Sequence, residues 1–245
     1  MPANHDLPLT RSNQGWLSVP EQWLIAWIAP RLPRWMAPDF LTALGFFASV
    51  AALVGYLLAA RNPAWLLGVN AALLVNWFGD SLDGAVARRR GIERPRYGFF
   101  LDQSVDVLSQ FLFAIGLGLS GFVRLDVTAI GLATYLMMTA QSLLRAEVSR
   151  TFHLASAGFG LTEVRCLFLA LNAAFYLKPP VPFDIAGTSL GYGDALGIAW
   201  IAVNLGLYLA GMIGQLRQLS RDEPPGGKAL KEDASGEMTC QKSTK

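Results

Sequence analysis

An all-α membrane protein, with six transmembrane helices preceded by an amphipathic interfacial helix, is the fold that the sequence predicts. Hydrophobic residues make up 53% of the chain and charged residues only 16%, whereas about a quarter of an ordinary soluble domain is charged. The apolar residues gather in six long stretches, and a helix needs roughly 20 such residues to cross a bilayer. Tryptophans precede the first stretch, and Trp favours the headgroup level of a membrane.

Four segments follow from this pattern. Residues 1–15 are polar and lack the basic-then-apolar order of a cleaved signal peptide. Residues 16–36 hold four Trp but are too interrupted by proline to span, which favours an amphipathic helix in the interface. Residues 37–217 are expected to form the six-helix transmembrane domain, and the polar residues 218–245 a disordered cytoplasmic tail.

Turns that contain proline, at residues 61–63 and 178–180, help to separate the apolar stretches. We expect the six spans at residues 40–60, 64–88, 98–121, 126–150, 160–178 and 190–216.

The basic residues predict the orientation. With an even number of spans, both termini lie on one side, together with the run Arg88–Arg90 and most other arginines. The opposite side keeps only Arg61, Arg124 and Lys178. Because Lys and Arg concentrate in cytoplasmic loops, we expect the termini and the segment around Arg88–Arg90 to be cytoplasmic.

Composition also limits the kinds of partner that the protein could bind and the membrane in which it could lie. A net charge of +2 gives no argument for nucleic-acid binding. Cys166 lies in an apolar run and Cys240 in the polar tail, which indicates neither a disulfide framework nor a metal knuckle. The compact size and the lack of a targeting segment favour a bacterial inner membrane, with membrane lipids as the surroundings.

Four aspartates interrupt the apolar pattern on either side of the turn RRRGIERPRY. Helical offsets place polar and small residues of the second span on one stripe, and those of the third span on another. The short turn makes the two helices antiparallel, so that their facing stripes would bring four carboxylates into one pocket. The first stripe holds Asp80, Asp83, Gly84, Ala87 and Arg88, and the second holds Gly98, Asp102 and Asp106.

Carboxylates inside a membrane span are costly unless they pair or face a cavity, and they mark function by default. Four together would repel one another, and hard divalent cations such as Mg²⁺ or Mn²⁺ relieve that repulsion. Small residues on the same stripes would let a ligand approach the backbone. Two other interpretations stay open: the acids are helix ends paired with arginines, and the small residues only pack the helices.

The segment D80-S-L-D83-G84-A-V-A87-R88, nine residues and then G98-F-F-L-D102-Q-S-V-D106 resembles the signature of the CDP-alcohol phosphotransferase family. That signature is DxxDGxxAR, a spacer, and GxxxDxxxD, and all eight of its fixed positions match. The layout of an amphipathic helix followed by six spans is similar too. The segment A37-P38-D39-F40-L41-T42 resembles the family's Pro-Asn-x-Leu/Ile-Thr element, with Asp39 in place of Asn.

The resemblance implies that the chain moves a substituted phosphate from a CDP-linked donor to an alcohol and releases CMP. It implies that the four aspartates of the two stripes ligate two Mg²⁺ or Mn²⁺ ions, and that Asp106 is also the general base. It also implies a homodimer. The residues that would border the nucleotide are Gly84, Ala87, Arg88, Gly98 and Thr42.

The alcohol is less clearly marked. Gln141 and Arg145 are four residues apart and Thr162 and Arg165 three apart, so each pair could share a helix face. Together with Arg150, the two arginines could form a pocket for a phosphorylated alcohol. The alternative is that the arginines hold lipid headgroups and set the topology.

CDP-diacylglycerol as donor and a small polar alcohol as acceptor, in phospholipid biosynthesis, is the preferred hypothesis. Transfer from CDP-choline or CDP-ethanolamine to diacylglycerol shares the signature and is the runner-up. Intramembrane prenyl transfer normally uses acids in two distant helix pairs, whereas this chain has one compact cluster. A divalent-cation transporter would not need small residues beside acids confined to one side of the membrane. A purely structural membrane protein is the least favoured alternative.

Overall fold

The computed structural model describes residues 10–12, 17–149, 151–153, 161–181, 183–185, 188–222, 231–232 and 238–239. Helices dominate this part of the chain, which confirms the all-α prediction. They are α1 (Ser18–Ile28), the 3₁₀ turn η1 (Ala29–Arg31), α2 (Pro38–Ala59), α3 (Trp65–Arg90), α4 (Pro95–Leu119), α5 (Leu125–Ser149), α6 (Leu161–Leu177) and α7 (Tyr192–Asp222).

The strands of the described residues are two or three residues long and form two-stranded sheets. The parallel pair is β1 (Thr10–Ser12) with β2 (Thr151–His153). The antiparallel pairs are β3 (Phe183–Ile185) with β4 (Thr188–Leu190), and β5 (Lys231–Glu232) with β6 (Met238–Thr239).

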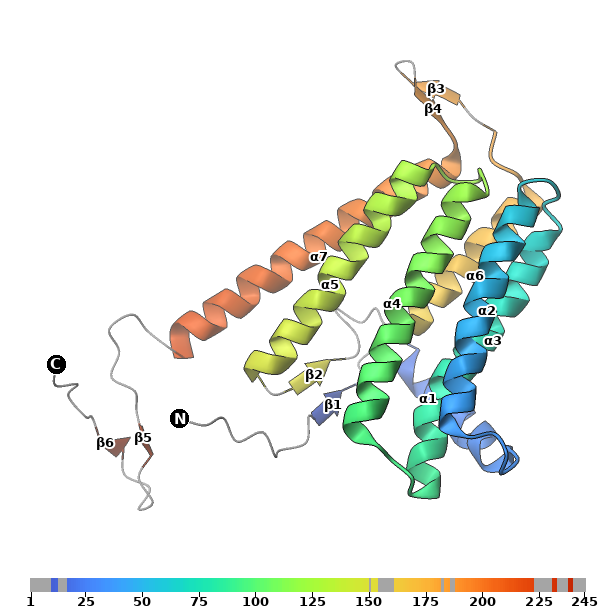
Figure 1. Cartoon of the computed structure of the whole chain (residues 1–245). Helices are drawn as coiled ribbons and strands as arrows, with labels where there is room; N and C mark the ends of the chain where they lie inside the picture. Colours follow the sequence, from blue (N-terminus) through green and yellow to red (C-terminus); the bar gives the residue numbers. More distant parts are fainter. Residues whose placement is uncertain are drawn as a thin grey trace.

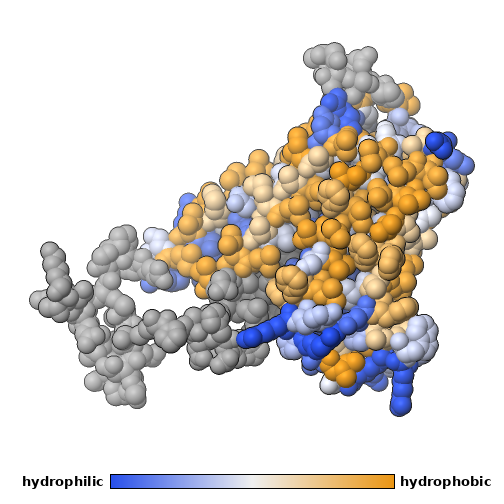
Figure 2. All heavy atoms as spheres, in the orientation of Figure 1, coloured by the Kyte–Doolittle hydropathy of each residue, from blue (hydrophilic) through white to orange (hydrophobic). Residues whose placement is uncertain are grey.

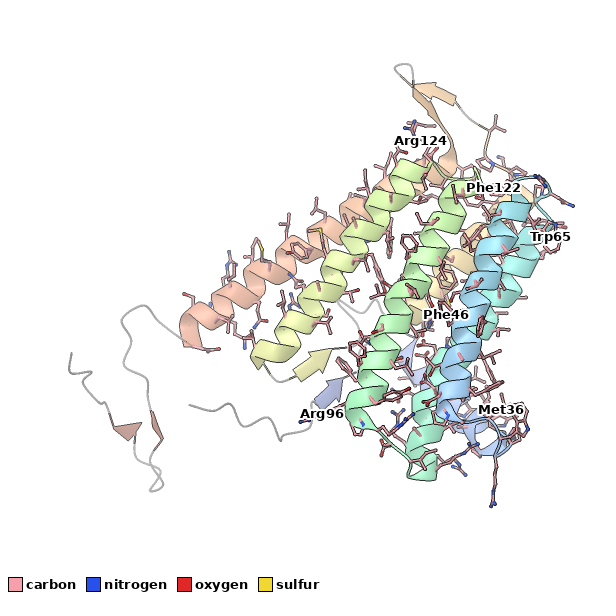
Figure 3. The ribbon with its side chains drawn as sticks, in the orientation of Figure 1. Met36, Phe46, Trp65, Arg96, Phe122 and Arg124 are labelled. Carbon is pink, nitrogen blue, oxygen red and sulfur yellow. The ribbon has the colours of Figure 1, made fainter. Side chains whose placement is uncertain are left out.

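The helices α2 to α7 run side by side and alternate in direction (Figure 1). Met36 and Arg96 lie toward one end of the bundle, called here the proximal end, and Trp65, Phe122 and Arg124 lie at the opposite, distal end (Figure 3). At the proximal end α3 ends, α4 begins, and α1 lies beside α3 and α6 (Figure 1).

Within the described residues, four helices are long and apolar enough to cross a membrane: α2, α4, the Leu125–Arg145 part of α5, and α7. Figure 2 shows hydrophobic residues over the flank of the bundle, with hydrophilic residues gathered toward its ends. The structure thus supports an integral membrane protein. It does not confirm the count of six spans, because α3 carries the charged signature residues and α6 has only 17 residues.

The helices α2 and α3 approach each other closely at two glycines. A Cβ added to Gly79 would lie 2.7 Å from the backbone nitrogen of Gly45. Small residues at such crossings let helix backbones come together in a membrane. The contact holds the part of α3 that carries the aspartates against the beginning of α2.

Apolar packing divides between the two ends of the bundle. The larger cluster of buried side chains lies toward the distal end and includes Tyr56, Leu66, Phe113 and Phe175. The smaller cluster, made by Ala29, Leu41, Leu82 and Val86, joins η1, α2 and α3 at the proximal end. Buried polar side chains lie between the two clusters, among them Ser49, Asn76, Ser109 and Arg165.

Candidate active site

Three of the four aspartates lie together near the proximal end. Asp80 on α3 and Asp102 and Asp106 on α4 each offer a carboxylate oxygen, and these oxygens all lie within 4.8 Å of one another. Gly91 ends α3 in the left-handed conformation, with φ 64°, and Pro95 begins α4 with a ring that suits the first turn of a helix. This turn makes the two stripes face each other, as their spacing predicts.

Asp83 lies on the same stripe of α3 but outside this group of three. Its carboxylate accepts a hydrogen bond of 2.6 Å from the hydroxyl of Thr42, and another from the backbone N–H of Gly84. Thr42, which the family element points to, therefore touches the signature directly from α2. The role of Asp83 as a metal ligand stays a prediction.

Arg165 of α6 supplies the positive charge in the cluster. Its Nη1 lies 2.8 Å from an oxygen of Asp80, and its Nη2 lies 3.9 Å from an oxygen of Asp106. The side chain of Arg165 is only 6% exposed. Removing one member of a buried charge pair leaves the other uncompensated, which is strongly destabilising. Arg165 is thus built into the carboxylate cluster.

Asn76 holds Arg165 in place. The Nε of Arg165 donates a hydrogen bond of 2.8 Å to the side-chain oxygen of Asn76. The Asn76 amide nitrogen donates to the Gly45 carbonyl and to the Ser49 hydroxyl, at 3.0 Å each, and Ser49 donates to Ser109 at 2.8 Å. Both ends of the buried amide are satisfied, so its orientation is determined. Asn76 precedes Asp80 by one helical turn, a spacing that could have revealed it in the sequence.

The remaining signature residues lie at the edge of the cluster. The Arg88 guanidinium covers Gly84, where an added Cβ would lie 3.2 Å from Nη1. Ala87 is half-buried, whereas Arg88 and Gly98 are exposed. An added Cβ on Gly98 would meet nothing within 4 Å among the described residues. As far as the described residues extend, this side of the cluster is therefore open to a ligand.

Two of the three arginines expected at the acceptor lie in the described part of the chain: Arg165 contacts the aspartates, and Arg145 contacts Gln141. Arg145 donates a hydrogen bond of 3.1 Å to Gln141, and Gln141 donates to the Tyr208 carbonyl of α7 at 3.0 Å. The contact between Gln141 and Arg145 confirms that they share a face. Arg145 packs over Gly211 of α7, where any Cβ would collide with its guanidinium. Arg150 lies outside the described residues.

A cavity of about 410 Å³ adjoins the cluster between α4, α5, α6 and α7. It follows α4 from Asp106 past Gln110 to Leu117, and Arg165 lines it beside Asp106. The side-chain oxygen of Gln110 is buried without a hydrogen-bond partner among the described residues. Most of the wall is apolar, including Phe113, Leu132, Phe168 and Trp200. The sequence did not predict this cavity, because its walls combine residues of α4 to α7 with Leu73 of α3, and only packing brings these helices together.

Known proteins resemble this chain over much of its length. The chain is 33% identical to archaetidylinositol phosphate synthase of Pyrococcus horikoshii, over 58% of this chain and 75% of that protein. It is 34% identical to the synthase of that name in Methanothermobacter thermautotrophicus, over 63% of this chain and 76% of that protein. It is 26% identical to cholinephosphotransferase 1 of Xenopus laevis, over 68% of this chain but only 42% of that protein.

A family model described as CDP-alcohol phosphatidyltransferase matches residues 35–210. That region runs from the approach to α2 into α7 and includes the aspartates, Thr42, Asn76 and Arg165. A match to a phosphatidyltransferase family argues against the hypotheses of a prenyltransferase, an ion transporter or a purely structural protein. The chain belongs to the CDP-alcohol phosphatidyltransferase family.

Proposed function

We propose that this protein transfers a phosphatidyl group from CDP-diacylglycerol to a small polar alcohol, with release of CMP, in phospholipid biosynthesis. Family membership supports phosphatidyl transfer from a CDP-linked lipid to an alcohol. One observation carries the proposal: Asp106 belongs to the carboxylate cluster and also lines the apolar cavity. A lipid linked to CDP needs both environments, one for its diphosphate and one for its chains.

The carboxylate cluster fits a divalent metal. Its oxygens are hard ligands, and three of them converge within 4.8 Å. We propose that Asp80, Asp102 and Asp106, with Asp83 beside them, hold two Mg²⁺ or Mn²⁺ ions. When bound, the ions would offset the charge of the donor diphosphate and of the departing CMP.

Asp106 is the proposed general base. The proton of the acceptor hydroxyl passes to a carboxylate oxygen of Asp106, while the acceptor oxygen forms a bond to the phosphorus that carries the lipid. The bond between that phosphorus and CMP breaks, and CMP leaves with its electron pair. Arg165 holds Asp106 through the weaker of its two ion pairs, at 3.9 Å. Gly84, Ala87, Arg88, Gly98 and Thr42 are the proposed nucleotide contacts.

The acceptor pocket is proposed to include Arg145 and Arg150, with Arg165 deeper beside the aspartates. Two relatives are named for an archaetidylinositol phosphate product. Guanidinium groups suit a phosphorylated acceptor of that kind, because they bind phosphate in a planar, bidentate manner.

The membrane arrangement completes the proposal. The helices α3 and α6 run alongside the four apolar helices and are proposed as the remaining two spans, with α1 in the interface (Figure 1). The arginine bias supports cytoplasmic termini and a cytoplasmic site. The bacterial inner membrane and the homodimer stay predictions from the sequence and the family resemblance.

The alternative is transfer of a CDP-linked amino alcohol to diacylglycerol. A relative named cholinephosphotransferase 1 favours it. The cavity is compatible with it as well, since a diacylglycerol hydroxyl could approach Asp106 from the apolar side.

An assay of purified protein in lipid vesicles separates the two. We expect CMP release and a new lipid mass with CDP-diacylglycerol, Mg²⁺ or Mn²⁺, and one alcohol from a panel that includes inositol phosphate, glycerol phosphate and serine. Excess chelator should stop the reaction. CMP release only from CDP-choline or CDP-ethanolamine with diacylglycerol would establish the alternative. The absence of CMP release from every donor would overturn the proposed function.

A further inference from the structure

Glu21, the acidic residue of α1, joins three helices through one oxygen. Its Oε1 accepts hydrogen bonds from the Trp77 indole at 2.9 Å and from the Ser81 hydroxyl at 3.2 Å, both on α3. It also accepts a hydrogen bond of 2.6 Å from the Thr162 hydroxyl on α6. Hydrogen bonds to a charged acceptor are stronger than those between neutral groups. Glu21 therefore ties α3 to α6.

The bridge lies next to the contact between α3 and α6 that builds the site. Ser81 directly follows Asp80, and Thr162 precedes Arg165 by one helical turn. The same two helices carry the 2.8 Å ion pair between Arg165 and Asp80. Glu21 is thus a neighbour of both ends of that pair without belonging to the cluster.

A second contact fixes α1 to α6. The backbone N–H of Leu17, just before α1, donates a hydrogen bond of 2.9 Å to the carboxylate of Glu163. The opposite face of α1 exposes Val19, Trp23 and Trp27. The helix therefore has one apolar outer face and one inner face that is hydrogen-bonded to α3 and α6.

Holding α3 and α6 together matters because they are not joined by a short loop. The chain passes through α4 and α5 between them, so their spacing depends on side-chain contacts. A guanidinium interacts with a carboxylate over a short range, and reacting groups need placement within about 0.5 Å. Glu21 contacts α3 one residue from Asp80 and α6 one helical turn from Arg165. Its hydrogen bonds can therefore set the spacing of α3 and α6 at the ion pair.

We propose that Glu21 is a positioning residue for phosphotransfer: it sets the spacing of α3 and α6 and so holds Arg165 against Asp80 and Asp106. The inference rests on the proposed function and deepens it. Glu21 acts through other residues and touches neither donor nor acceptor.

The first test is kinetic. Glu21→Ala should lower kcat for CMP release by about a hundredfold, the effect of misplacing a site by ~1 Å, and should leave KM for the donor within about twofold. Glu21→Gln keeps an oxygen that can accept from Thr162 and should recover most of kcat. Thr162→Val should lower kcat whereas Thr162→Ser should not, because only Ser keeps the hydroxyl. The double variant Glu21→Ala with Thr162→Val should be no slower than Glu21→Ala alone.

Gln22→Ala is the matched control, since Gln22 is the exposed neighbour of Glu21 on α1. It should keep kcat within about twofold of the wild type. Equal losses in Gln22→Ala and Glu21→Ala, an additive double variant, or wild-type kcat in Glu21→Ala would each overturn the proposal.

A distance measurement tests the spacing without any activity. Spin labels are placed on Cys166, which is exposed on α6, and on an Arg89→Cys variant of the exposed Arg89 of α3, with Cys240 changed to Ser. The distance distribution should broaden in Glu21→Ala and stay narrow in Glu21→Gln and Gln22→Ala. An unchanged distribution in Glu21→Ala would refute the inference. If the wild type releases no CMP while the distribution broadens, the proposed function fails and the bridge stands.

Discussion

The pair α2 and α3 and the pair α5 and α7 differ in how much of their apolar surface the protein buries. In α2, 44% of the most apolar stretch is buried inside the protein, whereas in α7 only 6% is. The first pair meets at Gly45 and Gly79 and surrounds the polar network of Asn76. The second pair exposes large apolar residues such as Leu196 and Val203 of α7. Hydrophobicity alone does not show which helices hold a site.

The difference has a physical reason. Buried charges need partners in fixed positions, because an uncompensated charge or amide inside a protein is costly. An apolar helix in a bilayer needs no such partners, because its side chains are as stable in contact with lipid tails as in contact with another helix. We infer that α2 and α3 form the rigid support of the aspartates, and that α5 and α7 form the cavity wall that faces lipid.

The largest expected effect is on chemistry at the carboxylate cluster, which α4 shares with α3 of the first pair. Asp106→Asn keeps the shape of the side chain but removes its capacity to take a proton. CMP release should fall by at least about a hundredfold, while thermal unfolding stays close to that of the wild type because Arg165 keeps its 2.8 Å ion pair with Asp80. Both are measured on purified protein. Near-normal turnover would refute Asp106 as the general base.

Two arginines allow the stability of the two pairs to be compared, since Arg165 contacts Asp80 of α3 and Arg145 of α5 contacts Gly211 of α7. Arg165→Met should destabilise the protein by about 3–5 kcal/mol, because it leaves Asp80 and Asp106 without their buried partner. Arg145→Met should cost less, since Arg145 is only half-buried whereas the side chain of Arg165 is 6% exposed. Denaturant unfolding in detergent measures both changes. Equal losses would show that the surroundings of the two arginines do not differ in this respect.

Substitutions at two glycines test how closely the helices pack in each pair. Gly79→Ala should destabilise by about 1–3 kcal/mol, because its Cβ would force α2 and α3 apart. Gly206→Ala in α7 meets nothing within 4 Å among the described residues, so the better helix propensity of Ala should leave stability unchanged or raised by up to ~1 kcal/mol. The same unfolding measurement applies. A stable Gly79→Ala variant would argue against the close approach.

The smallest effect is expected at the exposed start of α2. Asp39 pairs with Arg94 just before α4, and this hydrogen-bonded partner raises the pKa of the Arg94 guanidinium. Exposed ion pairs contribute little. Asp39→Asn, which restores the residue usual in the family, should therefore leave turnover and unfolding unchanged. A marked loss of activity would mean that Asp39 has a role beyond this pair.

Local spacing explains what could be predicted. The expected span at 40–60 appears as Pro38–Ala59, and that at 190–216 as Tyr192–Asp222. Asp80, Asp102 and Asp106 converge because i, i+4 offsets and a short turn are properties of neighbouring residues. The expected tail from residue 218 begins as the end of α7, and most of it lies outside the described residues.

By itself, the sequence determined the helical class, the apolar stretches, the reaction family and the acids that face one another across one turn. Only the tertiary structure decided that α6 lies against α3, and with it that Arg165 joins the aspartates instead of sharing the contacts of Arg145. The Asn76 network, the cavity and the Glu21 bridge also depend on that neighbour relation. Periodicity describes which face of a helix is polar, but the choice of the helix that meets that face comes from packing of the whole bundle.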